Sequence, residues 1–191
     1  LAWQDRDCHF IFGDVATAMV VEAAEVATAA CQFEVIDSRL TTIYSNAIRN
    51  NFGFVNRCED TPWTARDKLF HQEGRKVFKE VCVKVADIIG EQLLDAGLGG
   101  QGGTAVNRLW LHQANINMND YVSRRVLGAD HPRAQAPVVL DTFGNTASAG
   151  SIIAFHQHRD DLAVGDTGVI CSFGAGYSIG SVLVQRCNPA A

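Results

Sequence analysis

Residues 109–115, LWLHQAN, form an apolar run that ends on a histidine. The residues that follow, INMNDYVSRRVLG, are compatible with a helix. The same theme recurs twice more, with APVVLDTFGN (136–145) before the helix-compatible 146–162, and TGVICSFGAG (167–176) before the β-branched 177–186. This order predicts strand and helix twice and then two adjacent strands, which indicates an α/β layered domain with a mixed sheet.

Each of the three apolar runs ends on residues with functional chemistry. His112 ends the first, Asn145 the second, and a turn made of Gly174, Ala175 and Gly176 the third. In layered α/β sheets ligands gather beyond the carboxyl ends of strands, so one sheet can bring all three to the same edge. A neutral imidazole, a carboxamide and free backbone N–H groups would together stabilise negative charge on a carbonyl oxygen.

Each of these residues also has a purely structural interpretation. A histidine at a strand end is often a hydrogen-bonded structural residue. Asn145 stands where its side chain could cap a helix, and the glycine turn could simply join two strands. Only the coincidence of the three positions favours the functional interpretation.

Further elements are predicted upstream. Over residues 76–94 apolar positions recur at three- and four-residue steps, which predicts a long amphipathic helix that ends at the glycines of DAGLGGQGG. Residues 31–44 predict a strand, and residues 10–12 predict a strand followed by a turn. Residues 15–26 fit either strand or helix. The polar residues 46–64 predict a surface excursion.

The composition excludes several classes of function. The chain has 191 residues, 47% of them hydrophobic, and a net charge of -5, so it lacks the overall basic field that attracts nucleic acid or anionic membranes. No apolar run approaches the roughly 20 residues that span a bilayer. The six cysteines form no Cys-x-x-Cys motif, and several of them, such as Cys82 and Cys171, lie in apolar runs, which indicates a reducing cytoplasm.

Two apparent motifs fail on closer inspection. GAGYSIG precedes a β-branched segment rather than a helix, so it does not predict a dinucleotide site. His156 and His158, two residues apart on a predicted helix, would face nearly opposite directions. No metal site is therefore expected.

Three segments, LWLHQAN, LDTFGNTASAGS and SFGAGYSIGSVLVQR, resemble the C-terminal half of β-ketoacyl-acyl carrier protein synthase III, a condensing enzyme of the thiolase superfamily. FIFGD near the start and GRKVFKEVCVKVADIIGEQL extend the resemblance through nearly the whole chain. It implies a thiolase-like layered α/β fold whose mixed five-stranded sheet is flanked by helices. Residues 31–191 would form the C-terminal domain, and residues 1–30 the end of the N-terminal half or its junction.

The resemblance implies an acyltransferase mechanism. In the family a cysteine takes an acyl group from acyl-CoA, and residues matching His112 and Asn145 hold the thioester carbonyl of malonyl-acyl carrier protein while it loses carbon dioxide. The enolate then attacks the acyl-cysteine, and a backbone N–H matching Ala175 completes the oxyanion hole. This decarboxylating Claisen condensation belongs to fatty acid or related biosynthesis and needs no cofactor beyond its thioester substrates.

Further residues of this chain match substrate-binding and docking positions of the family. Gly74 and Phe78 match positions that line the pantetheine tunnel, and Phe173 matches an aromatic residue at the active site. Arg124 and Arg125 match a basic pair that docks the acidic carrier protein. The resemblance also implies a cytoplasmic homodimer built through the N-terminal half.

The chain departs from the family pattern at three points. The nucleophilic cysteine of the family lies before the first residue of this chain, so the chain is expected to supply half of a site and to be inactive alone. Asn117 stands where a basic docking residue is expected, and Arg75 replaces a polar amide near the pantetheine. Two alternatives therefore stay open: a non-catalytic thiolase-fold partner subunit, and a relative that uses a CoA ester or an amine as acyl acceptor.

Overall fold

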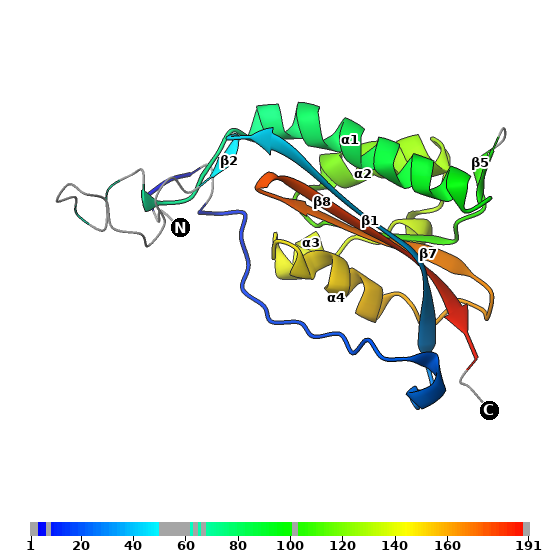
Figure 1. The fold of residues 1–191 in the computed structure, drawn as a ribbon. Helices are drawn as coiled ribbons and strands as arrows, with labels where there is room; N and C mark the ends of the chain where they lie inside the picture. The colour runs from blue at the N-terminus through cyan, green and yellow to red at the C-terminus, as the bar shows by residue number, and fades with distance from the viewer. Residues whose placement is uncertain are drawn as a thin grey trace.

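The structure is a computed structural model and describes residues 4–6, 9–49, 62, 65, 68–100 and 103–188. A mixed sheet lies between two layers of helices (Figure 1). Its four strands, in the order β1-β8-β7-β6, span Gln32–Ser45 (β1), Arg108–Leu111 (β6), Thr167–Gly174 (β7) and Gly176–Cys187 (β8). β6 and β7 are parallel, whereas β8 is antiparallel to both β7 and β1.

The helices cover both faces of this sheet. Helices α1 (Gly74–Asp95) and α2 (Ile116–Leu127) lie on one face, and α3 (Leu140–Phe143) and α4 (Ala149–Gln157) lie on the other (Figure 1). The minor elements are β2 (Ile48–Arg49) paired with β3 (His71–Gln72), β4 (Gly99–Gly100) paired with β5 (Gly103–Thr104), and the 3-10 turns η1 (Ala24–Val26) and η3 (Arg133–Gln135). This arrangement confirms the predicted α/β class, a mixed sheet flanked by helices.

The strands divide their side chains between two hydrophobic cores with the two-residue period of β structure. On β6, Leu109 and Leu111 join the core under α1 and α2, while Trp110 joins the core under α4. On β7, Val169 and Ile170 divide in the same way. Because both faces of these strands are covered, their sequences are continuous apolar runs rather than alternating ones.

Both long helices have local signals at their ends. α1 ends at Asp95, and Gly97 just beyond it has a φ of 73°, the left-handed conformation that glycine adopts freely. The N–H of Leu98 donates to the carbonyl of Leu93 at 2.8 Å. α2 begins after Asn115, whose side chain accepts a hydrogen bond from the N–H of Met118 at 3.1 Å. The helices predicted over residues 76–94 and after residue 115 are thus confirmed, and α4 confirms a helix within residues 146–162.

The strand predicted over residues 136–145 is wrong. These residues form a loop and the one-turn helix α3. Pro137 has no N–H to contribute to a ladder, and the N–H of Val139 donates instead to the Gln113 side chain at 3.1 Å. The described part of the main sheet therefore contains four strands rather than the expected five.

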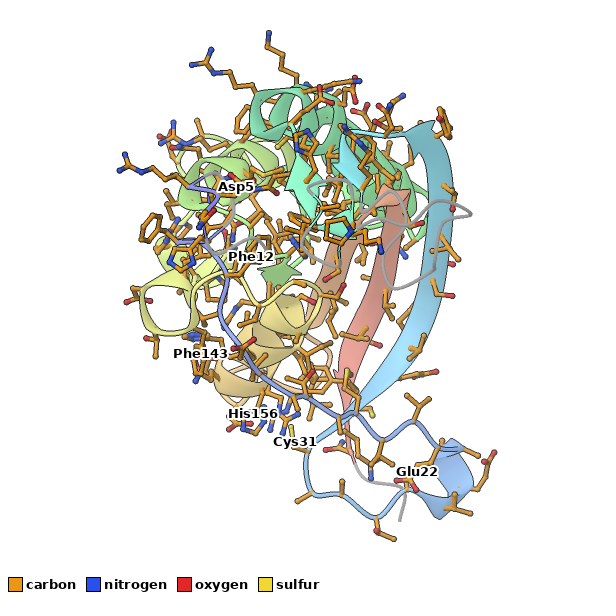
Figure 2. All side chains as sticks on the ribbon, turned by 90° about the vertical axis from the view of Figure 1, so that its left-hand side faces the viewer. Asp5, Phe12, Glu22, Cys31, Phe143 and His156 are labelled. Atoms are coloured by element: carbon orange, nitrogen blue, oxygen red, sulfur yellow. The ribbon has the colours of Figure 1, made fainter. Side chains whose placement is uncertain are left out.

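The N-terminal segment also differs from expectation. Residues 10–12 form one isolated bridge, from Phe12 to Asn145, in place of a strand. Residues 15–26 contain only the turn η1, and the chain runs past α3 and α4 to the start of β1 (Figures 1 and 2). β1 confirms the strand predicted over residues 31–44. Residues 50–61, 63 and 64 of the predicted surface excursion lie outside the described residues. The boundary between residues 30 and 31 stays a prediction.

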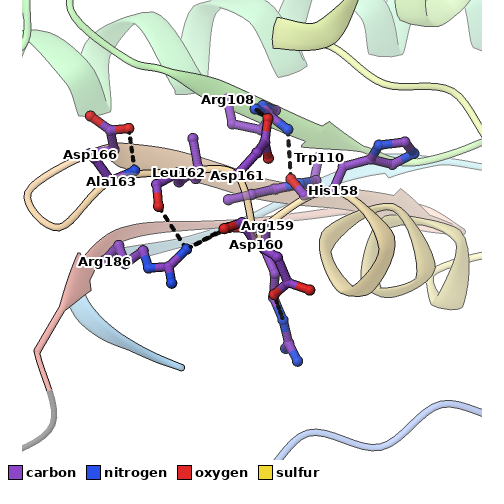
Figure 3. Close-up of polar contacts among 10 residues, drawn as sticks. All are labelled: Arg108, Trp110, His158, Arg159, Asp160, Asp161, Leu162, Ala163, Asp166 and Arg186. Atoms are coloured by element: carbon purple, nitrogen blue, oxygen red, sulfur yellow. Dashed lines mark hydrogen bonds and ion pairs between the residues drawn. The ribbon is translucent and has the colours of Figure 1, made fainter. Parts of the chain in front are cut away.

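Two arginines hold the loop between α4 and β7 (Figure 3). Arg186 donates to the main-chain carbonyls of residues 159, 160 and 162 at 3.3, 2.8 and 2.6 Å. Arg108 donates to the carbonyl of His158 at 2.7 Å and pairs with Asp161 at 2.8 Å. These bonds satisfy carbonyls that follow the end of α4. Arg108 begins β6, so this polar cluster lies at the opposite end of the strand from His112 and supports the fold.

Candidate active site

The carboxyl ends of β6 and β7 lie at the same edge of the sheet because the two strands are parallel. His112 directly follows β6, and the turn at Ala175 joins β7 to β8 at that edge. The N-terminal end of α1 and the helix α3 lie at the same end of the molecule, on the left in Figure 1. The topology thus brings the histidine and the glycine turn to one edge.

His112 is buried, with 7% of its surface exposed. Its ring lies against the ring of Phe173, with 4.2 Å between the centroids and 43° between the planes. Burial disfavours the charged imidazolium and lowers the pKa of His112 from 6.5 to about 4. The imidazole is therefore neutral at pH 7 and can act as a hydrogen-bond donor without carrying charge.

Asn145 lies in the loop after α3, and not at the strand end that the sequence predicted. Its N–H donates to the carbonyl of Ile11 at 2.8 Å, and its carbonyl accepts from the N–H of Gly13 at 2.9 Å. Its side-chain Oδ1 accepts from the N–H of Ala147 at 2.9 Å. Because the amide oxygen is engaged, the NH₂ group is the part of Asn145 that can donate to a ligand.

Two glycines permit this close approach between residues 11–13 and Asn145. A Cβ atom on Gly13 would lie 2.0 Å from the carbonyl oxygen of Phe143, and Gly144 has a φ of 64°. Figure 2 shows Phe12 and Phe143 on the two segments that meet here. The FIFGD motif therefore holds the backbone of Asn145, a role that the sequence analysis did not assign to it.

Gln113 connects the segment that carries His112 to the segment that carries Asn145. It is fully buried, and its Oε1 accepts from the N–H of Val139 in the loop before α3. Gly150 packs directly on it, because a Cβ there would lie 2.8 Å from Cβ of Gln113. The only sequence signal for this role is a glutamine between an apolar run and the start of a helix.

The end of β7 contacts both neighbouring segments. Phe173 lies on His112, and the adjacent Ser172 shares a 2.7 Å hydrogen bond with Ser151 near the start of α4. Ala175 follows in the turn between β7 and β8. The three chain segments that carry His112, Asn145 and Ala175 are thus joined by direct contacts.

The residues expected to bind pantetheine lie at the start of α1. Gly74 is its first residue and is exposed, with open space around it. Phe78 is half-buried one turn later, and its ring packs on Tyr121 of α2 with 5.9 Å between centroids. Phe78 therefore packs between α1 and α2 at the end of the molecule that holds the glycine turn.

The expected docking residues lie on the surface of α2. Arg124 and Arg125 are both exposed in its last turn. Arg125 forms an ion pair with Asp87 of α1 at 3.0 Å, which offsets part of its charge. Asn117 is exposed in the first turn of the same helix.

Neither of the two described cysteines in the core is a suitable nucleophile. Cys82 and Cys171 are buried, and burial raises the pKa of each thiol to about 12. At neutral pH both are protonated and inert. Cys8 and Cys58 lie outside the described residues. Within the described ranges no group of three or more His, Cys, Asp or Glu side chains could hold a metal ion, and no helix is long and apolar enough to cross a membrane.

Comparison with solved structures shows which fold this is. The 3-oxoacyl-[acyl-carrier-protein] synthase III of Aquifex aeolicus VF5 superposes with a TM-score of 0.69 at 20% identity, covering 96% of this chain and 53% of that one. The synthase III of Thermus thermophilus gives a TM-score of 0.69 at 21% identity, covering 100% of this chain and 56% of that one. The fold is thus thiolase-like, and the chain corresponds to about half of these structures.

Sequence comparison then gives the family. Residues 100–186 match the family model described as 3-Oxoacyl-[acyl-carrier-protein (ACP)] synthase III C terminal. The beta-ketodecanoyl-[acyl-carrier-protein] synthase of Pseudomonas aeruginosa is 54% identical over 186 residues, covering 97% of this chain and 52% of that protein. The beta-ketoacyl-[acyl-carrier-protein] synthase III of Erythrobacter litoralis is 31% identical, covering 97% and 54%. The chain spans about half the length of these curated relatives and matches the C-terminal part of the synthase III family, which confirms the resemblance.

Proposed function

We propose that this chain supplies the histidine and asparagine half of an acyltransferase active site. The reaction is the decarboxylating Claisen condensation of an acyl-CoA-derived acyl group with malonyl-acyl carrier protein, in fatty acid or related biosynthesis. The observation that carries the proposal is His112, neutral and buried at the carboxyl end of β6 in contact with Phe173. The family match supports it.

The decarboxylation step needs neutral hydrogen-bond donors. The bond between the malonyl carboxylate and the α-carbon breaks, carbon dioxide leaves, and the electron pair spreads onto the thioester oxygen as an enolate. An N–H of His112 and the NH₂ group of Asn145 would both donate to that oxygen. Each well-aimed donor of this kind lowers the barrier by about 3 to 4 kcal/mol.

The condensation step uses a nucleophile from the other half of the enzyme. The enolate carbon attacks the carbonyl of an acyl-cysteine thioester, the new carbon–carbon bond forms, and the cysteine thiolate leaves. We assign the N–H of Ala175 to the oxyanion of this step. Cys82 and Cys171 cannot serve as the nucleophile because their thiols are buried and protonated. The reaction requires no cofactor beyond the thioesters.

Substrate binding is assigned by position. Gly74, Phe78 and Phe173 are proposed to contact the pantetheine arm and the reacting thioester. Arg124 and Arg125 are proposed to dock the acidic carrier protein. This contact has less positive charge than the family pattern implies, because Asn117 is neutral and Arg125 is paired with Asp87. That reduced charge favours, as a second candidate, a condensing enzyme whose acyl acceptor is a CoA ester.

A relative's name, together with the chemistry of the condensation, supports a length for the priming acyl group. The Pseudomonas aeruginosa relative is named a beta-ketodecanoyl synthase. Because the condensation adds two carbons, a ten-carbon product requires an eight-carbon primer. We therefore propose a medium-chain primer for this chain. A panel of acyl-CoAs of increasing length, with mass measurement of the acylated protein, identifies the chain length that is accepted.

We further propose a cytoplasmic homodimer assembled through the N-terminal half, with the domain boundary near residue 30. The described cysteines Cys31, Cys82, Cys171 and Cys187 are free thiols, which agrees with a reducing compartment. The oligomeric state is measured by sedimentation of the assembled enzyme. A monomer that retains full condensing activity would contradict the dimer.

The central test replaces His112 by alanine in the enzyme assembled with its N-terminal half. Release of carbon dioxide from malonyl-acyl carrier protein should fall by about 10² to 10³, as for the loss of one oxyanion donor. Acylation of the cysteine, followed by intact mass, should persist. Unchanged decarboxylation would remove His112 from the mechanism. An assembled wild-type protein that neither becomes acylated nor releases carbon dioxide would instead support a non-catalytic partner.

A further inference from the structure

A small cavity lies beside His112, between β7 and the helices α1 and α2. Its volume is about 10 Å³. Its walls are apolar side chains and Cys171, except for two polar residues, His112 and Asn119. The cavity is thus lined by two polar side chains inside an otherwise apolar layer.

Both polar residues have a buried nitrogen without a partner. Nδ1 of His112 and Nδ2 of Asn119 are fully buried and form no hydrogen bond with any described residue. Asn119 is only 3% exposed and lies on the buried face of α2 between Met118 and Val122. A buried amide without a partner costs free energy, and asparagine is a poorer helix former than leucine. Asn119 at this position therefore points to a function.

We propose that Asn119 is a positioning residue that sets the tautomer of His112 through one water molecule bound in this cavity. A cavity of this size holds one water. Nδ2 of Asn119 donates to the water, and the water donates to Nδ1 of His112. This inference rests on the proposed function, because it assigns a proton that the decarboxylation step requires.

The direction of these hydrogen bonds follows from the donor inventory. The amide nitrogen of Asn119 only donates, so Nδ1 of His112, on the other side of the water, must accept. Nδ1 of a neutral imidazole accepts only when it is unprotonated, and the ring proton then lies on Nε2. If Nδ1 carried the proton, two N–H groups would converge on the water and both of its O–H groups would face apolar walls.

The contact with Phe173 and the link to Asn119 have separate effects. The phenyl ring restrains the plane of the imidazole, with 4.2 Å between centroids. It is indifferent to which nitrogen carries the proton. Asn119 determines which nitrogen carries the proton, and Nε2 becomes the N–H donor for the thioester oxygen.

The test compares three variants of the assembled enzyme. Asn119→Leu removes the donor with similar volume. Asn119→Asp replaces the donor with a carboxylate that accepts from Nδ1–H. Ser123→Ala is the control, because Ser123 is fully buried on the same helix and bonds to the carbonyl of Asp120, away from the cavity. For each protein the tautomer of His112 is read from imidazole ¹⁵N chemical shifts, and decarboxylation and cysteine acylation are measured separately.

Wild-type enzyme and the control should show the Nε2–H tautomer of His112. Asn119→Leu should show a mixture of tautomers and a decarboxylation kcat lower by about tenfold, with cysteine acylation unchanged. Asn119→Asp should show Nδ1–H and a loss of about 10² or more that deepens with rising pH as the carboxylate ionises. An unchanged tautomer and kcat in both Asn119 variants would overturn the proposal, even if His112→Ala remains inactive. Full activity of His112→Ala would instead overturn the proposed function.

Discussion

The imidazole of His112 and the phenyl ring of Phe173 lie with their centroids 4.2 Å apart and their planes inclined by 43°. His112 follows β6 and Phe173 belongs to β7, so the contact joins the carboxyl ends of two parallel strands. The phenyl ring helps to exclude water from the imidazole. Because burial causes the low pKa of His112, this packing contact contributes to its neutral state.

Removing the ring of Phe173 should therefore change the pH dependence of decarboxylation. In Phe173→Ala, water reaches the imidazole and the pKa of His112 rises from about 4 toward 6.5. As the pH is lowered, the decarboxylation rate of the assembled variant should therefore begin to fall at a higher pH than that of the wild type. Phe173→Leu, which keeps an apolar neighbour, is the control and should shift less. Superimposable pH profiles for wild type and Phe173→Ala would show that the ring does not shield His112.

The same pKa shift predicts a pH dependence of stability. The unfolded chain protonates His112 at its ordinary pKa of 6.5, whereas the folded chain does so only near 4. The unfolded state thus binds more protons between these values, and the free energy of unfolding falls as the pH falls. His112 alone should contribute a loss of about 3 kcal/mol between pH 7 and pH 4.

Denaturant unfolding of the assembled enzyme at several pH values measures this contribution. His112→Gln removes the titrating group and serves as the matched comparison. The difference in stability between wild type and variant should shrink or reverse as the pH falls from 6.5 to 4. A pH-independent difference between the two proteins would contradict the buried neutral state of His112.

Much of the fold could be predicted from the sequence because it depends on local periodicity. β6, β7 and β8 are apolar or β-branched runs, and the buried positions of α1 recur every three or four residues. The position of His112 at the sheet edge then follows from strand order. Residues 136–145 could not be predicted, because their backbone partners are distant in the chain: Gln113 binds Val139, and residues 11 and 13 bind Asn145.

The environment of the site was even less accessible to sequence reasoning. Asn119 stands in a polar-looking helix, NMNDYVSRR, where an asparagine suggests a solvated face. Only packing shows that it is 3% exposed and lines the cavity beside His112. Gln113 is similar, because its burial depends on the approach of Gly150 from α4. Such residues are placed by tertiary contacts that leave no periodic signal.

A methyl group on Gly13 should disturb Asn145. In Gly13→Ala the new Cβ would lie 2.0 Å from the carbonyl oxygen of Phe143, so the segment must move and the two hydrogen bonds to Asn145 must lengthen. The assembled variant should lose about 1 to 3 kcal/mol of stability and most of its decarboxylation activity. Gly90→Ala is the control: a Cβ there meets nothing within 4 Å in the middle of α1, and the substitution should stabilise by about 1 kcal/mol. Equal activity of both variants would show that the FIFGD segment does not position Asn145.

Charge reversal on α2 should separate carrier-protein docking from chemistry. Arg124 and Arg125 are both exposed, but Arg125 is held by Asp87 at 3.0 Å. Arg124→Glu should therefore raise KM for malonyl-acyl carrier protein more than Arg125→Glu does, because Asp87 already offsets part of the charge of Arg125. The effect of Arg124→Glu should weaken as salt screens the surface charges. With malonyl-CoA as acceptor, which carries no acidic protein surface, kcat and KM of both variants should match wild type. If Arg124→Glu leaves KM for malonyl-acyl carrier protein unchanged at low salt, the acidic carrier protein docks elsewhere. A CoA ester then becomes the better assignment for the acyl acceptor.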